Sequence, residues 1–488
     1  MCLVLICEFC IKIQRLSGIS QLSSKIESKE EDEIMVKIKN KKTRRMIAML
    51  MAAVILTGCG TRNFSNPSNQ SNMTSESESR PKAETTGFKE VILSEQEMFA
   101  QENEFSQGIN RFSYDIFSKL DDGKNIFLSP YSIATAFSML ANGADGETKQ
   151  EIMDLFGIQD LDKWNAYLKE YTNQYKNEDT KLLTANSIWL SNQLALSQRA
   201  DMEFFTPLSV YYHAEKKQAD LSTDATRKEI NEWVSENTNG MINPFLKENL
   251  ESSIQMFLLN AVYFAGDWEQ EFEKKDTQIL TFYGANKETE VNMICKYGKE
   301  FKYIEKDGIQ GVELPYKENK LAMDILIPKE IDTENQQADK KNIKECFNKL
   351  SEEEKNQIFA ALDAAETEEI STLILPKFTL NYYAEKLKDM LIEMGLSTTF
   401  GEDAVFDKIT KGICVDEVTH ESIIEVDEKG TKASAVSSIM MKETASEIRE
   451  EKKFIVNQPF IFVIRDVETG TILFMGDMQD MLEDNKKE

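Results

Sequence analysis

The sequence predicts a fold that mixes α-helices with β-strands, and three stretches carry that prediction. Between residues 105 and 120, apolar residues recur at three- and four-residue steps, which is the period of an amphipathic helix. Residues 126–140 are typical of a short strand, a Ser-Pro helix start and a buried helix. Residues 425–442 alternate in polarity around a single glycine, which is the two-residue period of a strand.

Length, charge and composition narrow the class of protein. The chain has 488 residues, and length alone favours roughly two to four domains. Asp and Glu outnumber Lys and Arg by 84 to 57, which gives a net charge of −27. A general nucleic-acid binder needs basic surface, so this balance argues against one. Hydrophobic residues make up 41% of the chain, which is enough to build a large core.

The start of the chain is predicted to be a leader. Residues 1–34 have no clear structural role, and we expect translation to begin at Met35. Residues 35–58 form a basic region and a short apolar run, which indicate a secretion signal rather than a spanning helix. The run leads into Leu-Thr-Gly-Cys, which resembles the lipobox of bacterial lipoproteins. This resemblance implies that Cys59 becomes a lipidated N-terminus.

A tether is expected between the lipid and the folded body. Residues 59–94 are rich in Ser, Asn, Glu and Thr, a composition typical of a flexible linker. The folded body is then predicted to span residues 95–488. Lipid on Cys59 would hold the protein on the extracellular side of the bacterial cell envelope without a transmembrane helix.

The folded body is expected to open with the amphipathic helix. Its apolar face consists of Phe105, Ile109, Phe112, Ile116 and Leu120. The strand at 126–129 leads into Pro130, which favours a helix start, and Gly143 and Gly146 mark the end of that helix. Another helix is expected to open at Ile230 and to end near Thr238.

Residues with reactive side chains are few in the body. Its three cysteines, Cys295, Cys346 and Cys414, are odd in number and imply no disulfide framework, so each is expected to be a small buried hydrophobe. The chain has two histidines, His213 and His420, and the body has no GxSxG, HExxH, P-loop or paired CxxC motif. We therefore expect no cofactor, no metal and no common enzyme class, although a Ser–His–Asp triad built on His420 stays open.

The stretch around Gly430 combines strand periodicity with small residues. Beyond this glycine, every second residue is small or apolar, and the charges fall on the other face. The small or apolar set is Thr431, Ala433, Ala435, Ser437, Ile439 and Met441. Ser and Ala have modest strand propensity. Two interpretations therefore remain open: a strand buried on one side, or an exposed loop that can become a strand.

The same stretch resembles the hinge of the serpin family, through Glu428-Lys429-Gly430-Thr431 followed by the small residues Ala433 and Ala435. Other segments resemble serpins in the family's order: residues 125–148, 185–190, 212–215, 230–240, 259–268, 313–316, 323–328, 375–378, 457–462 and 473–476. The resemblance covers roughly residues 95–480 as one domain. It implies an α+β serpin fold with three β-sheets, eight or nine helices, an exposed reactive loop and a metastable native state.

The resemblance also implies a suicide inhibitor of proteases rather than an enzyme. A protease would cut the reactive loop and form an acyl-enzyme, and the loop from Thr431 onward would insert into the main sheet before water could release the protease. The expected partner is a serine endopeptidase, with cysteine proteases left open. The protein is expected to be a monomer.

Loop length predicts where the protease would cut. At about 3.3 Å per residue, the ~14 residues from Thr431 to Thr444 span about 45 Å, which is enough to cross a large sheet. The family's usual loop length puts the scissile bond at Thr444–Ala445, within about one or two residues. Small or apolar residues there suit an elastase- or subtilisin-like enzyme, while Lys442 and Arg449 are alternatives that would suit a trypsin-like one.

The resemblance further implies residues that control the opening of the main sheet. It puts Ser129, Ser132, Asn260 and His420 in a polar cluster beneath the sheet, where buried polar groups need hydrogen-bond partners. It puts Trp268 at the top of the sheet, where the loop first enters. Without the resemblance, His420 and Trp268 would be interpreted as a satisfied core histidine and a large core aromatic residue.

Two other functions stay open. One is a non-inhibitory serpin-fold binding lipoprotein. The small residues at 433–435 and the absence of proline and charge from 433 to 441 argue against it, because proline or charge would hinder burial in a sheet. The other is an extracellular lipoprotein enzyme, which would show hydrolytic turnover that is lost when a serine or histidine is replaced.

Overall fold

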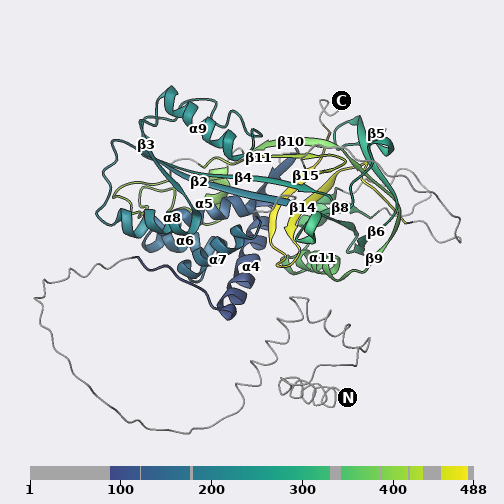
Figure 1. The fold of residues 1–488 in the computed structure, drawn as a ribbon, viewed down its shortest axis with the longest axis horizontal. Coiled ribbons are helices and arrows are strands. Elements are labelled where there is room, and N and C mark those ends of the chain that lie inside the picture. The colour runs from purple at the N-terminus through teal and green to yellow at the C-terminus, as the bar shows by residue number, and fades with distance from the viewer. Residues whose placement is uncertain are drawn as a thin grey trace, which may run out of the picture. The chain divides into compact units, whose positions relative to one another are not determined.

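The computed structural model describes residues 88–481, except 121–122, 176–179, 330–341, 385–386, 416–417 and 432–451. These residues all belong to one compact unit, Thr85–Glu488 (Figure 1). Several predicted sites lie outside the described residues: Cys59, Ala433, Ala435, Lys442, Thr444, Ala445 and Arg449. The predicted leader and most of the tether also lie outside them.

Nine α-helices occur among the described residues. They are α4 (Glu95–Lys119), α5 (Pro130–Gly143), α6 (Gly146–Phe156), α7 (Leu161–Asn173), α8 (Thr206–Tyr212), α9 (Asp224–Asn237), α10 (Ile343–Asn348), α11 (Glu352–Ala364) and α12 (Leu387–Glu393). The apolar face predicted for the first helix is confirmed, because Phe105, Ile109 and Phe112 of α4 are fully buried. In the described ranges, no helix is both long and apolar enough to span a membrane.

Helix starts follow local capping chemistry. Ser94 and Glu97 form a capping box at the start of α4, in which each side chain accepts the other residue's backbone N–H. Ser129 caps α5 by accepting the N–H of Ser132. The helix expected to open at Ile230 begins earlier, at Asp224, because the Thr223 side chain caps it there. That predicted start was wrong.

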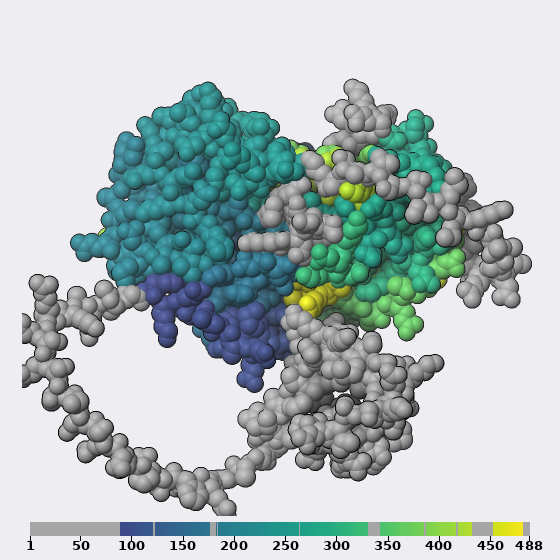
Figure 2. All heavy atoms as spheres, in the orientation of Figure 1, coloured from purple at the N-terminus to yellow at the C-terminus, as the bar shows by residue number. Residues whose placement is uncertain are grey.

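One sheet, called here the main sheet, has six strands. Their order is β10 (Phe378–Tyr383), β11 (Glu421–Val426), β12 (Gly430–Thr431), β4 (Met256–Asp267), β2 (Thr180–Ser191) and β3 (Glu215–Ala219). Strands β2 and β4 are the long pair that crosses the molecule in Figure 1. Figure 2 shows residues coloured teal gathered over one half of the visible face and green to yellow residues over the other.

The other strands join through β6. Their order is β1 (Ile126–Leu128), β15 (Ile472–Met478), β14 (Phe460–Asp466), β8 (Leu321–Pro328), β7 (Ile309–Pro315), β6 (Glu288–Lys306), β9 (Thr367–Pro376) and β13 (Lys453–Ile455), with β5 (Gln278–Tyr283) also on β6. The first part of β6 pairs with β5 and its last part with β7. Gly298 lies between these parts with a positive φ. This long strand therefore belongs to two sheets, which makes three in all.

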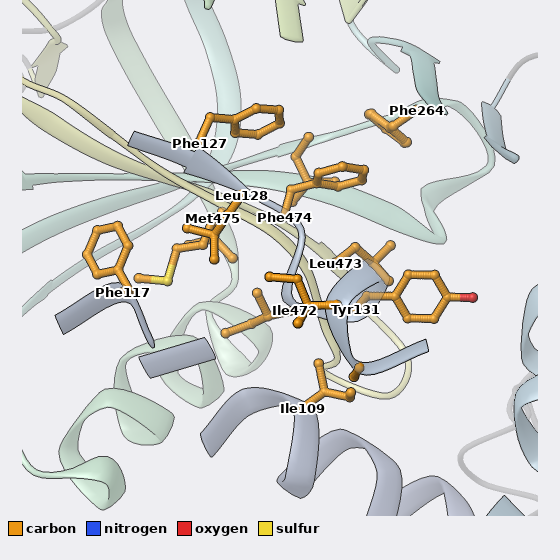
Figure 3. Close-up of a cluster of buried hydrophobic side chains, with 14 of the residues drawn as sticks. Ile109, Phe117, Phe127, Leu128, Tyr131, Phe264, Ile472, Leu473, Phe474 and Met475 are labelled. Carbon is orange, nitrogen blue, oxygen red and sulfur yellow. The ribbon is translucent and has the colours of Figure 1, made fainter. Parts of the chain in front are cut away.

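The main hydrophobic core lies between the main sheet, the strands β8, β14 and β15, and helix α5. Every residue of β8, β14 and β15 is buried, including the charged residues Asp324, Arg465 and Asp477. Phe127 stacks on Phe474 with ring centroids 5.5 Å apart, and Phe264 of β4 lies 6.0 Å from the same ring (Figure 3). The opposite face of the main sheet packs against α9, where Trp233 and Leu259 belong to a second apolar cluster.

The three cysteines that the structure describes are free thiols that do not share one environment. Cys295 is buried, Cys346 is half-buried and Cys414 is exposed. The expectation of a buried hydrophobe is therefore confirmed for Cys295 and wrong for Cys414. Cys414 lies outside the regular strands and helices, so no periodic pattern marked its exposure.

Candidate functional site

The hinge is the turn that connects β11 to β12. Asp427 builds this turn, because its Oδ1 accepts the backbone N–H groups of Lys429 (2.8 Å) and Gly430 (3.2 Å). After the turn, Thr431 pairs with Val426 of β11 on one side. On the other side, Gly430 and Thr431 pair with Asp267 and Gly266 at the end of β4. The chain thus starts a new strand between β11 and β4.

Gly430 is required at the start of this strand by close backbone packing. It pairs with Asp267 in β4, and a Cβ on Gly430 would lie 2.7 Å from the Asp267 Cα and closer still to the Gly266 carbonyl oxygen. The atoms in contact belong to the backbone of β4, which cannot move far enough to make room for a Cβ. A residue without a Cβ is therefore needed for β12 to pair with β4.

Trp268 and Tyr316 fix the other side of the hinge. The Trp268 backbone N–H donates to the carbonyl of Lys429 (2.8 Å), and its indole Nε1 donates to the carbonyl of Asp427 (3.0 Å). The Trp268 ring stacks on Tyr316, with centroids 4.7 Å apart. The Tyr316 hydroxyl lies 2.8 Å from Thr431 Oγ1, and burial raises the pKa of Tyr316. Thr431 is 2% exposed, so its side chain sits in a closed aromatic site.

Glu428 is a buried carboxylate at the hinge. Thr277 Oγ1 donates to its Oε1 (2.9 Å), the Lys377 ammonium lies 3.4 Å from its Oε2, and its carbonyl accepts the N–H of Phe272 (2.7 Å). Burial pushes the pKa of Glu428 up. The hydrogen bonds from its own backbone N–H and from Thr277, with the Lys377 charge, outweigh burial and hold the pKa below its usual value. Glu428 is therefore a charged, fixed point next to Gly430.

The predicted polar cluster forms beneath the main sheet. His420 Nε2 accepts the backbone N–H of Ser129 (3.1 Å), and Ser129 Oγ donates to the carbonyl of Leu473 (2.8 Å). Ser132 Oγ donates to Asn260 Oδ1 of β4. The cluster therefore connects the start of α5 to β4 and to the end of the segment before β11. Burial lowers the pKa of His420 to about 4, so its ring is neutral at pH 7.

Asn186 extends this cluster across the next strand. Asn260 Nδ2 donates to Asn186 Oδ1 (2.6 Å), and Asn186 Nδ2 donates to the carbonyl of Tyr212 (2.8 Å). Sequence reasoning missed Asn186, which it treated only as part of a strand. The available signal was an amide side chain in the middle of a run that is otherwise largely apolar or small. Such a residue must find a partner when it is buried.

The sequence-predicted residues fall into two groups. Ser129, Ser132, Asn260 and His420 come together beneath the sheet. Trp268 lies eight residues beyond Asn260, about 26 Å along an extended strand, and contacts the hinge instead. The hinge residues Glu428, Gly430 and Thr431 lie at that same end.

A triad built on His420 is not supported by this geometry. Among the described residues, the hydrogen bond from Ser129 to His420 comes from the backbone N–H, whereas the Ser129 hydroxyl donates to Leu473. No Ser–His–Asp arrangement therefore forms there. In the same described ranges, no group of three or more His, Cys, Asp or Glu side chains is placed to hold a metal ion.

Below the hinge, β4 extends past its pairs with β12, and a cavity lies beside it. In the part of the chain that the structure describes, β12 pairs with both strands, and β4 and β11 form no pairs with each other. A cavity of about 430 Å³ lies alongside the lower part of β4. Its largely apolar lining includes Phe137 of α5, Met256 and Leu258 of β4, and Val418 and His420 before β11.

The fold and the hinge define a class of protein: a three-sheet domain whose main sheet starts an additional strand, β12, between β11 and β4. Residues 107–481 match the family model described as Serpin (serine protease inhibitor), which covers most of the chain, and the protein belongs to the serpin family. The expected α+β serpin fold, with three sheets and nine helices among the described residues, is confirmed. Members of this family are generally protease inhibitors rather than enzymes.

Three comparisons illustrate the likeness. An uncharacterized serpin-like protein of Thermococcus kodakarensis is 31% identical over 448 residues, covering 90% of this chain and 99% of the relative. Serpin B4 of Homo sapiens is 30% identical and covers 77% of this chain and 98% of the relative. The crystal structure of the thermophilic serpin tengpin in its native state has a TM-score of 0.67 and 28% identity, with 82% of this chain and 98% of that chain covered.

Proposed function

We propose that this protein is a suicide inhibitor of proteases that inserts its cleaved loop between β4 and β11. The observation that carries the proposal is strand β12. Gly430 and Thr431 pair with β4 on one side, Thr431 pairs with Val426 of β11 on the other, and β4 continues for ten more residues past those pairs. Among the described residues, β4 and β11 form no pairs with each other, so a further strand could be added between them. Unpaired buried backbone groups favour addition of a strand.

The register of β12 determines which loop residues would be buried. Continuing the pairs of Gly430 with Asp267 and Thr431 with Gly266 puts residue 432 opposite Ala265 and residue 441 opposite Met256. Side chains alternate between faces, so residues 433, 435, 437, 439 and 441 would share the buried face of Thr431. All five are Ala, Ser, Ile or Met. This face can be buried without leaving a charge in the sheet.

The length of β4 supports a cut near Thr444–Ala445. The twelve residues of β4 accommodate residues 430–441, so an arm that ends at Thr444 passes the end of β4 by three residues. A cut at Arg449 would leave eight residues beyond that end. Lys442 remains the basic alternative within reach.

The chemistry of trapping follows the acyl-enzyme scheme. The protease serine would attack the Thr444 carbonyl, the amine of Ala445 would leave with a proton, and an ester would join the protease to Thr444. Insertion would then carry the protease away from the hinge before water attacks the ester. A target with a small or apolar specificity pocket suits Thr444 and Met441. The cut itself needs no cofactor.

The cavity beside β4 favours a second candidate, a non-inhibitory binding lipoprotein with the same fold. A largely apolar cavity of about 430 Å³ falls in the size range of small-molecule sites. The two candidates predict opposite outcomes with proteases: an inhibitor is cut once and stays attached, whereas a binding protein is cut and released.

The protein would act at a membrane surface. We propose lipid attachment at Cys59 and a position on the extracellular side of the cell envelope, because the basic region, the short apolar run and the Leu-Thr-Gly-Cys box occur in order. Mass spectrometry of the N-terminal peptide tests this directly. The added mass of acyl chains on Cys59 supports the anchor, and an unprocessed leader or an unmodified thiol contradicts it.

The function is tested by incubating the protein with elastase, subtilisin, trypsin and a papain-like protease. A denaturing gel should show a band at the summed mass with at least one of them, and sequencing the released C-terminal peptide should place the cut at Thr444–Ala445. An active-site-blocked protease is the matched control and should form no such band. Cleavage by all four proteases with no band would contradict the inhibitory function.

A further inference from the structure

We propose that Lys296 is a positioning residue that holds the hinge in register for loop insertion. This proposal rests on the inhibitory function proposed above. Lys296 lies on β6, outside the main sheet, and sequence patterns gave no reason to select it. It acts on the hinge through the segment that follows β4, residues 268–272.

The Lys296 ammonium is tied to backbone carbonyls. Its Nζ donates to the carbonyl of Gln270 (2.7 Å) and to that of Glu271 (2.5 Å), and it lies 5.0 Å from the centroid of the Phe272 ring. Three consecutive residues of the segment are therefore in contact with one side chain. Hydrogen bonds from a charged donor are stronger than neutral ones. A lysine can make both bonds because it has three N–H donors.

The same segment holds the hinge. The Trp268 N–H and indole donate to the carbonyls of Lys429 and Asp427, and the Phe272 N–H donates to the carbonyl of Glu428. Residues 269–272 lie outside the regular helices and strands, so their path depends on such individual bonds. Lys296 fixes two carbonyls immediately before Phe272. It therefore fixes the position of the Phe272 N–H, which donates to the backbone carbonyl of Glu428.

In the described part of the chain, no carboxylate forms an ion pair with this ammonium, although Glu273 and Glu271 attract it from farther away. The nearby acidic side chains have other partners: Glu271 lies 3.0 Å from Lys317, and Glu273 lies 2.6 Å from Lys275. Burial, with a smaller contribution from the like charge of Lys299, lowers the pKa of Lys296 to about 8. Partial burial of a cation costs free energy, and the two carbonyls are the groups that compensate it.

The consequence for insertion concerns the first two residues of β12. With the hinge held, Gly430 and Thr431 are already paired with β4, so insertion extends an existing strand. Without Lys296, Gly430 and Thr431 would have to pair with β4 after the cut. Insertion would then be slower, while the rate at which water hydrolyses the ester would not change. More protease would then escape. The rate at which the loop is cut should not change, because Lys296 does not belong to the loop.

The test compares Lys296→Met, Lys296→Arg and the matched control Lys299→Met in the otherwise intact protein. Methionine keeps the packing on Phe272 but donates no hydrogen bond, and arginine restores donors. Lys299 is an exposed lysine on the same strand. Two quantities are measured: hydrogen–deuterium exchange of peptides that cover residues 268–273 and 427–431, and the number of inhibitor molecules cut per protease trapped.

For Lys296→Met, exchange in both peptides should rise by about tenfold, as expected for loss of a charge-assisted bond. The number cut per protease trapped should rise several-fold at an unchanged cutting rate. Lys296→Arg should recover most of both effects, and Lys299→Met should match the wild type. Unchanged exchange or an unchanged trapping ratio in Lys296→Met would overturn the proposal, as would failure of arginine to restore either. If the wild type forms no adduct but exchange follows the prediction, the inhibitory function falls while Lys296 is confirmed as the support of the hinge.

Discussion

Thr431 is a residue at which a single substitution separates cutting from trapping. Its side chain is 2% exposed and its hydroxyl contacts Tyr316 under the stacked Trp268 ring. Thr431→Arg would require a charge to be buried there, so we expect the variant to be cut at the normal rate but not to trap protease. Thr431→Val keeps the shape without the charge and should still trap. Adduct formation by the arginine variant would contradict insertion.

His420 gives the cluster beneath the main sheet a dependence on pH. Its pKa of about 4 lies below the ordinary value of 6.5, so the unfolded chain takes up the proton first as pH falls. Folded stability should therefore be complete above pH 6.5 and decline below it, by about 2 kcal/mol at pH 5. Protonation would also put a hydrogen on His420 Nε2, which could then no longer accept the Ser129 N–H.

Urea unfolding of the wild type and of His420→Gln between pH 7.5 and 5 measures this contribution. Glutamine does not titrate, so the difference between the two stability curves should shrink as pH falls. Carboxylates with lowered pKa values, such as Glu428, lose their contribution at lower pH and are common to both proteins. Parallel curves for the two proteins would contradict the role given to His420.

At the scale of elements, the amides of Asn260 and Asn186 join β4 to β2 and to α5. Asn260→Ala would leave the Ser132 hydroxyl and the side-chain Oδ1 of Asn186 without these partners. We expect a loss of about 1–3 kcal/mol in the free energy of unfolding. The exposed amide of Gln357 on α11 provides a control, because Gln357→Ala should change stability by less than about 0.5 kcal/mol. Equal effects of the two substitutions would contradict a special role for Asn260.

Elements with a strong local signal could be predicted from the sequence. The apolar period of α4 and the Ser-Pro start of α5 are local chemistry; α5 starts where expected, while α4 extends ten residues before the predicted apolar period. The start of α9 was misplaced because the Thr223 cap lies outside the apolar pattern used to find the helix. Cys414 was misjudged because composition says nothing about exposure in an irregular segment.

Contacts between elements far apart in the sequence could be predicted only from the family resemblance, and the others were found only in the structure. The resemblance grouped Ser129, Ser132, Asn260 and His420, and hydrogen bonds join Ser129 to His420 and to Ser132, and Ser132 to Asn260. Asn186 and Lys296 were missed. Their partners, the Asn260 amide and the carbonyls of Gln270 and Glu271, depend on strand pairing that no local pattern encodes.

For the whole molecule, loop insertion implies that the intact folded state is less stable than the state with the loop inserted. The main sheet has β12 begun, two strands, β4 and β11, that do not pair with each other in the described residues, and a cavity beside β4. Completing that sheet would bury more backbone and side chains than the intact chain does. The lifetime of the intact form would then be set by a kinetic barrier, and a cut in the loop would remove the barrier.

The measurement that tests this claim most directly is thermal unfolding before and after a single cut in the loop. Protein cut within residues 440–450 should unfold at a temperature well above that of the intact protein, because the new strand completes the main sheet. Thr431→Arg, cut in the same way, should show no such rise. An unchanged or lower unfolding temperature for the cut wild type would contradict insertion, and the inhibitory function proposed here would fall with it.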